Sequence, residues 1–165
     1  MVSRRPRKSL DPVRARDRQA VRAAAVALLA RRDFASTELT GRLLSQGYEP
    51  ELVANTIGEL RQGRILDDAR FAEHYVAHHA ERGQGSARIA TQLRALGLAD
   101  GLVDAAVQSG PDWRALAREV LIRKFGLAPP RTRAEQARQA RFLQYRGFSS
   151  DHIRSALGPD FDPDA

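Results

Sequence analysis

The sequence contains no cysteine, a single methionine and a single tryptophan, and aromatic residues make up only 6% of its 165 residues. Without cysteine there is no disulfide and no thiolate metal ligand, which agrees with a reducing compartment. No stretch has the apolar run of a signal peptide, and none approaches the ~20 apolar residues of a membrane span. We therefore expect a cytoplasmic protein without a membrane partner.

Runs of β-branched residues are also missing, and no segment alternates between polar and apolar residues for long. Alanine and leucine dominate the hydrophobic residues, which make up 42% of the chain and are numerous enough to build a core. Apolar residues instead recur at helical spacing along most of the chain. The sequence predicts an all-α protein.

Groups that could carry out catalysis are sparse. His74, His78 and His79 have metal-ligand spacing, but zinc would need further ligands, and we interpret them as surface or interface histidines. Asp67 and Asp68 resemble paired metal ligands, although an acid at a helix start is more simply a cap. No serine and aspartate are placed with a histidine as in a triad, and no Gly-Lys-Ser/Thr phosphate loop follows a strand. We expect neither an enzyme nor a cofactor.

Glycine recurs with a regular period along the chain. Gly47, Gly97 and Gly147 stand 50 residues apart, and the residues around them match in all three places. The matching apolar positions are Leu43, Leu93 and Leu143 before each glycine, then Tyr48, Leu98 and Phe148, and then Val53, Val103 and Ile153. Such a period predicts tandem repeats that bury their apolar faces against their neighbours.

The middle repeat shows the expected plan of each unit. Asp67 caps a first helix, Gly83 and Gly85 turn the chain, Ser86 caps a second helix, and Gly97 ends it. The expected apolar stripes are Phe71, Tyr75, Val76 and Ala80 in the first helix and Ile89, Leu93 and Leu96 in the second. In the third repeat, Thr132 and Glu135 form a capping-box pair.

We therefore predict an elongated, curved array of three tandem three-helix repeats with about nine helices. The expected parts are a disordered basic arm (1–9), three repeats (10–64, 65–110 and 111–158) and a flexible acidic tail (159–165). In the first repeat, Asp11 and Pro12 are expected to start a helix that runs to about Arg32. Gly110-Pro111 is the clearest boundary between repeats in the sequence. We expect hinges at Gly110-Pro111 and at Gly63.

Charge is distributed unevenly along the sequence. The chain has 27 Lys/Arg, 25 of them arginine, against 20 Asp/Glu, for a net charge of +7. Residues 1–32 and 113–148 are strongly basic, whereas residues 33–112 carry more acids than bases. Arginine-rich surfaces suit phosphates and carboxylates, so the basic ends indicate contact with nucleic acid or with an acidic protein.

One stretch resembles a known family signature. The segment Leu66-Asp67-Asp68-x-Arg70-Phe71-Ala72, followed by Gly83-x-Gly85, Arg88-Ile89, Leu93 and Gly97-Leu98, resembles the RecX family of bacterial regulators of the recombinase RecA. The resemblance covers the whole chain in architecture and is concentrated in the middle repeat. Histidine stands at position 79, near which the family often carries a basic residue.

The resemblance implies a function and a set of contact residues. A RecX-like protein is expected to bind the RecA filament on single-stranded DNA and to suppress strand exchange, ATP hydrolysis and the co-protease activity of the SOS response. Double-stranded DNA is a further expected ligand. The residues expected to bind these partners are Arg70, Arg82, Arg88 and Arg94 in the middle repeat and Arg123, Lys124, Arg131, Arg133, Arg138 and Arg141 in the third.

An alternative interpretation is a stand-alone helical DNA-binding protein. Short helices that meet at glycine corners resemble helix-turn-helix units, and the helix from Ala87 to Leu96 offers Arg88, Gln92 and Arg94 as base-reading side chains. In a second form of this interpretation, the basic ends of the chain bind DNA phosphates without reading the base sequence.

Overall fold

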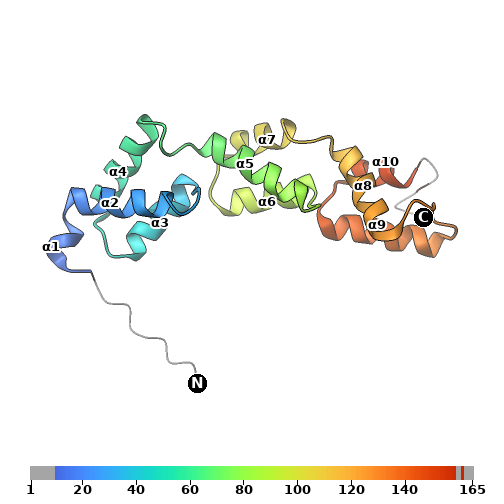
Figure 1. Ribbon diagram of the computed structural model, residues 1–165, viewed down its shortest axis with the longest axis horizontal. Helices are drawn as coiled ribbons and strands as arrows, with labels where there is room; N and C mark the ends of the chain where they lie inside the picture. The colour runs from blue at the N-terminus through green and yellow to red at the C-terminus, as the bar shows by residue number, and fades with distance from the viewer. Residues whose placement is uncertain (1–9, 159–160, 162–165) are drawn as a thin grey trace, which may run out of the picture. The chain divides into compact units, whose positions relative to one another are not determined.

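The computed structural model describes residues 10–158 and 161, and all regular structure in this part of the chain is helical (Figure 1). The helices of the described residues are α1 (Pro12–Ala15), α2 (Arg18–Leu29), α3 (Ser36–Ser45), α4 (Pro50–Gln62), α5 (Asp68–Glu81), α6 (Ser86–Ala95), α7 (Asp100–Gln108), α8 (Trp113–Phe125), α9 (Arg133–Arg146) and α10 (Ser150–Leu157). The all-α prediction is confirmed. The expected basic arm and nearly all of the expected acidic tail lie outside the described residues. Among the helices of the described part, none is long and apolar enough to cross a membrane.

The chain divides into two compact units, unit 1 (Met1–Phe71) and unit 2 (Ala72–Ala165). Helices α1 to α4 belong to unit 1, α6 to α10 belong to unit 2, and α5 begins in the first and continues in the second. Gly110-Pro111, the boundary expected from the sequence, lies inside unit 2. The division into three repeats stays a prediction.

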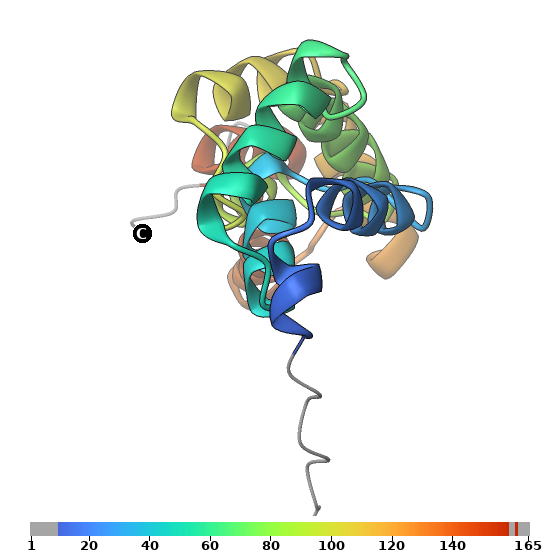
Figure 2. The same ribbon diagram turned by 90° about the vertical axis from the view of Figure 1, so that its left-hand side faces the viewer.

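Two helices replace the single first helix that the sequence predicted. α1 ends at Ala15, and α2 starts afresh with Asp17 as its N-cap, whose carboxylate accepts a hydrogen bond from the Gln19 N–H at 2.8 Å. α1 does not continue along the direction of α2 in either view (Figures 1 and 2). The prediction of one helix to about Arg32 was wrong, because Asp17 competes for the backbone N–H groups of the next turn.

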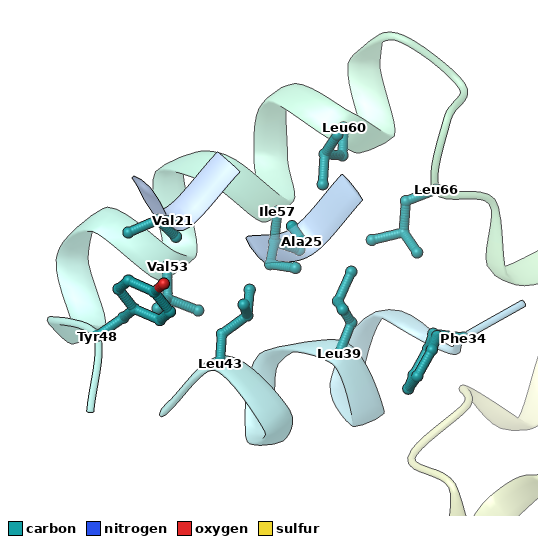
Figure 3. Close-up of a cluster of buried hydrophobic side chains, with 10 residues drawn as sticks. All are labelled: Val21, Ala25, Phe34, Leu39, Leu43, Tyr48, Val53, Ile57, Leu60 and Leu66. Atoms are coloured by element: carbon teal, nitrogen blue, oxygen red, sulfur yellow. The ribbon is translucent and has the colours of Figure 1, made fainter. Parts of the chain in front are cut away.

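Unit 1 is held together by one cluster of buried side chains. α2, α3 and α4 each contribute one apolar face, and the segments between them add two aromatic rings (Figure 3). The cluster consists of Val21, Ala25, Phe34, Leu39, Leu43, Tyr48, Val53, Ile57, Leu60 and Leu66. The matching apolar positions of the first repeat, Leu43, Tyr48 and Val53, therefore lie in its core, as the periodicity predicted.

The periodic glycines end their helices in the same way. Gly47, Gly97 and Gly147 have φ values of 99°, 84° and 89°, a conformation that only glycine adopts without strain. In each case the N–H of the next residue returns to a leucine carbonyl one turn earlier, which is the Schellman ending. These N···O pairs are Tyr48–Leu43 (3.4 Å), Leu98–Leu93 (3.3 Å) and Phe148–Leu143 (3.1 Å), and all six side chains are buried.

The start of α6 rests on the end of α9. Gly85, and not Ser86, is the N-cap of α6, and it makes no side-chain cap, so the predicted role of Ser86 was wrong. Instead, the Gly85 N–H donates to the Arg146 carbonyl at 2.8 Å, and the Ala87 N–H donates to the Gly147 carbonyl at 3.0 Å. The N–H groups at the start of one helix thus meet carbonyls at the end of another, so the positive end of one helix dipole lies beside the negative end of the other.

This α6–α9 junction leaves no room for a side chain on either glycine. A Cβ atom on Gly85 would lie 2.2 Å from the Phe148 nitrogen, and one on Gly147 would lie 2.1 Å from the Arg88 Cβ. Both distances are far below van der Waals contact, so the backbones approach this closely only because both residues are glycine.

We predict that Gly85→Ala lowers the free energy of unfolding by about 1–3 kcal/mol, the usual cost of forcing extra atoms into a packed site. Gly101→Ala is the matched control, since a Cβ there, in the first turn of α7, meets nothing within 4 Å. The control should be neutral or stabilising by roughly 0.5–1 kcal/mol. Urea unfolding followed by circular dichroism measures the free energy of unfolding of both variants. Equal free energies for the two would contradict the close backbone contact at Gly85.

Candidate nucleic-acid interface

The paired acids of the signature have structural partners. The Asp67 carboxylate accepts from the N–H groups of Ala69 (3.0 Å) and Arg70 (3.1 Å), and the Arg70 bond is the main reason why the pKa of Asp67 is lowered. The Asp68 carboxylate accepts from the Ser36 N–H at 2.7 Å and so caps α3. These two acids therefore fix helix starts, as predicted for Asp67.

The three histidines of α5 do not assemble a metal site. The His79 ring stacks on Tyr75 with centroids 4.1 Å apart, and the His78 ring meets it edge-on at 5.3 Å. Burial lowers the pKa of His79, and the neighbouring His78 and Arg82 lower it further. Within the described ranges, no three His, Asp or Glu side chains are placed to hold a metal ion.

Four cationic side chains of unit 2 line one small cleft of about 120 Å³, which we call the basic cleft. Arg82 follows the end of α5, Arg123 and Lys124 stand in the last turn of α8, and Arg146 ends α9. Three helix C-termini therefore contribute the cations, and the negative end of a helix dipole favours positive side chains there. The rest of the lining is Gly83, Val120 and Phe142.

Contacts inside the basic cleft hold part of this charge in place. The Arg146 guanidinium lies 5.3 Å from the Phe142 ring centroid and donates to the Arg82 carbonyl at 3.4 Å. Arg123 pairs with Glu119 at 2.5 Å. In the part of the chain that the structure describes, no acid pairs with Arg82 or Lys124. The cleft therefore carries four cations against one carboxylate.

Three of the predicted contact residues, Arg82, Arg123 and Lys124, come together in the basic cleft. Arg146 was not predicted, although a basic residue in the last turn before a glycine is a recognisable helix-end signal. Arg146 reaches the cleft because the end of α9 lies beside the ends of α5 and α8. The density of charge along the sequence gives no information about that arrangement.

A second group of predicted residues lies around the corner between α8 and α9. Arg131 and Arg138 line a shallow cleft there, and the Arg138 guanidinium lies 5.6 Å from the Phe125 ring centroid. Thr132 caps α9 as predicted, accepting from the Glu135 N–H at 3.1 Å, but the Glu135 carboxylate accepts from the Arg131 N–H at 2.7 Å. The remaining predicted residues of this region, Arg133 and Arg141, are exposed on α9.

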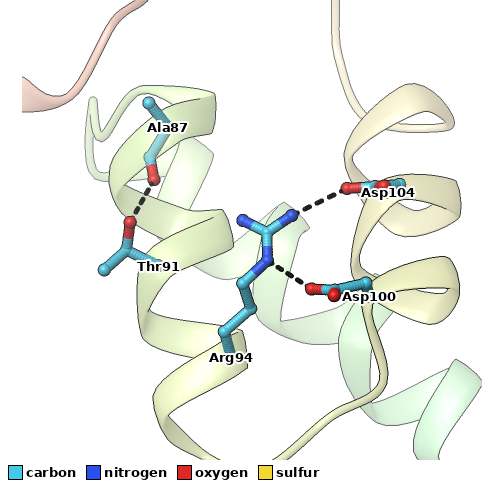
Figure 4. Close-up of polar contacts among 5 residues, drawn as sticks. All are labelled: Ala87, Thr91, Arg94, Asp100 and Asp104. Atoms are coloured by element: carbon cyan, nitrogen blue, oxygen red, sulfur yellow. Dashed lines mark hydrogen bonds and ion pairs between the residues drawn. The ribbon is translucent and has the colours of Figure 1, made fainter.

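Arg94 joins α6 to α7. Its Nε atom lies 2.7 Å from Asp100 Oδ1 and its Nη2 atom lies 2.9 Å from Asp104 Oδ1 (Figure 4). The hydrogen bond to Asp100 raises the pKa of Arg94 above its already high ordinary value. The charge of this predicted contact residue is therefore balanced by two acids of the same unit.

Arg70 and Arg88 are exposed and make hydrogen bonds to carbonyl groups. Arg70 donates to the Ile65 carbonyl at 3.2 Å. Arg88 donates to the Tyr145 carbonyl at 3.3 Å, and its guanidinium lies 5.8 Å from the centroid of the Tyr145 ring. Both guanidinium groups keep their charge, because a carbonyl does not neutralise them.

The described part of the chain is an all-helical protein with helix-end glycines and a cationic cleft, which is the kind of surface that binds an anionic partner. Comparison with known proteins identifies the family. Residues 67–107 match the model of the second three-helix domain of RecX, and residues 112–157 match the model of the third. The chain is 45% identical to the regulatory protein RecX of Halorhodospira halophila over 139 residues, which are 84% of this chain and 86% of the relative. It is 42% identical to that of Ectopseudomonas mendocina, over 84% of this chain and 93% of the relative. The chain therefore belongs to the RecX family of regulatory proteins.

Solved structures agree on the fold. The crystal structure of RecX from Lactobacillus salivarius superposes with a TM-score of 0.74 at 20% identity, covering 85% of this chain and 94% of that chain. A second RecX crystal structure gives a TM-score of 0.70 at 22% identity, covering 88% of this chain and 76% of that chain. The same fold thus persists where little of the sequence is shared.

We predict that the protein loses stability as pH falls below 6.5, before its acids titrate. Burial lowers the folded-state pKa of His79 and His152 below the ordinary 6.5, so the unfolded chain takes up protons first. Stability is therefore full above 6.5, falls as pH drops through 6.5, and stops falling below the folded pKa. The lowered pKa values of Asp67 and Asp112 act in a separate window, below 3.8.

Thermal unfolding at a series of pH values measures this effect. His79→Gln should reduce the fall in the unfolding midpoint below pH 6.5, and the part that remains should come from His152. An unfolding temperature that stays constant from pH 7 down to the range where the acids titrate would contradict the lowered pKa values of these two half-buried histidines.

Proposed function

We propose that this protein binds the filament of a RecA recombinase on single-stranded DNA and inhibits strand exchange, ATP hydrolysis and the co-protease activity of the SOS response. Membership of the RecX family supports the proposal, together with the RecA-linked signature around Asp67 and Gly85. The observation that carries it is the basic cleft, because a filament on single-stranded DNA presents phosphates beside protein.

The basic cleft suits phosphate groups. Its four cations face one carboxylate, and arginine forks match the geometry of phosphate oxygens. Binding by such a surface releases counterions from the nucleic acid and weakens as salt rises. Arg133, Arg138 and Arg141 on α9 and Arg131 just before it add further positive charge, and we assign them to the same partner.

Arg70 and Arg94 of the middle region are our proposed contacts with the recombinase. Arg70 keeps an exposed guanidinium group that, among the described residues, hydrogen-bonds only to a carbonyl. Arg94 is paired with Asp100 and Asp104, but both pairs are exposed, and exposed ion pairs contribute so little that a carboxylate of a partner can replace them. A regulator that acts through such contacts needs no catalytic group of its own.

A stand-alone DNA-binding protein is the second candidate, and the basic cleft supports it equally. Reading of bases by α6 is disfavoured, because its N-terminal turn is covered by the end of α9 in the α6–α9 junction. Gln92 is also engaged, 3.3 Å from the Tyr75 hydroxyl. DNA binding without a protein partner would therefore rest on phosphates and show no sequence preference.

The proposal predicts that the protein, titrated into the cognate RecA on single-stranded DNA, lowers the rate of ATP hydrolysis. Inhibition well below one molecule per recombinase would indicate action at filament ends, and inhibition only near equal ratios would indicate binding along the groove. Unchanged hydrolysis, with direct and salt-sensitive DNA binding still present, would reject the recombinase partner and favour the second candidate.

Charge reversal of the basic cleft should abolish this inhibition. We expect Arg82→Glu/Arg123→Glu/Lys124→Glu to weaken binding and to reduce the slope of log K against log salt by about 0.7 for each phosphate that the variant no longer binds. The matched control is Arg31→Glu/Arg42→Glu/Arg61→Glu, which makes the same charge change at exposed positions of unit 1. Equal inhibition by the two triple variants, both with unchanged circular dichroism, would remove the cleft from the proposed interface.

A further inference from the structure

Tyr145 is an exposed aromatic residue near the C-terminal end of α9. Its exposed fraction is 78%, whereas Leu143, two residues earlier, is completely buried. Among the described residues, none forms a hydrogen bond with its hydroxyl group. The ring is therefore dispensable for the packing of unit 2, and an exposed ring of this size is available to a ligand on at least one face.

Arginines flank this ring. The Arg88 guanidinium lies 5.8 Å from the ring centroid and is held there by its hydrogen bond to the Tyr145 carbonyl. Arg141 and Arg138 precede Tyr145 by four and seven residues in α9, so helical spacing places them along one face with it, and all three are exposed. The face thus combines one ring with three cations.

We propose that Tyr145 stacks on a base of single-stranded DNA while Arg88 and Arg141 bind the phosphates beside that base. This inference rests on the proposed function and names the element that selects the single strand. A base offers an aromatic face only when it is not stacked and paired in a duplex, and stacking on a side-chain ring tolerates any base. Each base of a strand has phosphates beside it, and this ring has Arg88 beside it and Arg141 one helical turn away.

The position of Tyr145 connects this surface to the basic cleft. Arg146, the next residue, belongs to the cleft, and its guanidinium packs on Phe142. A strand whose base rests on Tyr145 therefore has its backbone at the same end of α9 as the cleft cations. The α6–α9 junction fixes Arg88 against this helix end, so the stacking site exists before the ligand arrives.

Tyr145→Ala tests the inference with two probes, a fluorescently labelled oligo(dT) and an abasic oligonucleotide of the same length. The abasic strand keeps the phosphates and lacks the bases. We expect the variant to bind oligo(dT) about 5- to 150-fold more weakly, the usual effect of losing one stacked base, and to bind the abasic strand as the wild type does. Tyr145→Phe and Tyr145→Trp should restore the preference for oligo(dT), because both keep an aromatic ring.

Leu127→Ala is the matched control, because Leu127 is also exposed, at 83%, and carries no ring. Equal weakening of both probes by Tyr145→Ala would overturn the inference, since the ring would then act on the phosphate surface. Unchanged oligo(dT) binding together with weaker binding to the recombinase filament would also overturn it and would assign Tyr145 to the protein partner. If Tyr145→Ala leaves both probes unaffected while the triple cleft variant binds neither, the stacking site is wrong and the phosphate surface of the proposed function stands. If the wild type binds neither probe, the stacking inference is wrong, while the proposed function is tested separately by the inhibition of ATP hydrolysis.

Discussion

The arrangement of unit 2 depends on a contact between two pieces of backbone. In the α6–α9 junction, the N–H groups of Gly85 and Ala87 reach the carbonyls of Arg146 and Gly147, and neither glycine has space for a Cβ atom. A buried N–H without a partner is costly, so the start of α6 is stable only where the end of α9 meets it. This contact sets the place of Arg88 beside Tyr145 and of Arg146 beside Arg82, and so it positions the whole candidate interface.

Local rules were enough to predict most of the helices and the core. Gly47, Gly97 and Gly147 end their helices as predicted, because a positive φ after an apolar turn is a property of the glycine and of its immediate neighbours. The errors came where one local rule competed with another or with a distant partner. Asp17 interrupts a pattern that otherwise continues as one helix. Ser86 is a residue type that often caps helices, but the N–H groups at the start of α6 bond instead to carbonyls at the end of α9, far along the sequence.

The candidate interface was predictable in its composition and not in its geometry. The density of arginine and lysine pointed to Arg82, Arg123 and Lys124, but nothing in the sequence shows that the ends of α5, α8 and α9 converge. Arg146 was missed for the same reason. Arg94 was predicted as a contact residue from its charge alone. In the structure, Asp100 and Asp104 on the next helix balance that charge, and a count of charges along the chain cannot show this pairing.

The dependence of α6 on α9 also bears on how the chain is made. A ribosome releases α6 before α9 has been synthesised, so the first turn of α6 emerges without the carbonyls that complete it. Until residues 146 and 147 leave the exit tunnel, only water is available to those N–H groups. The first turn of α6 is therefore completed only when a segment that lies much later in the chain has been made.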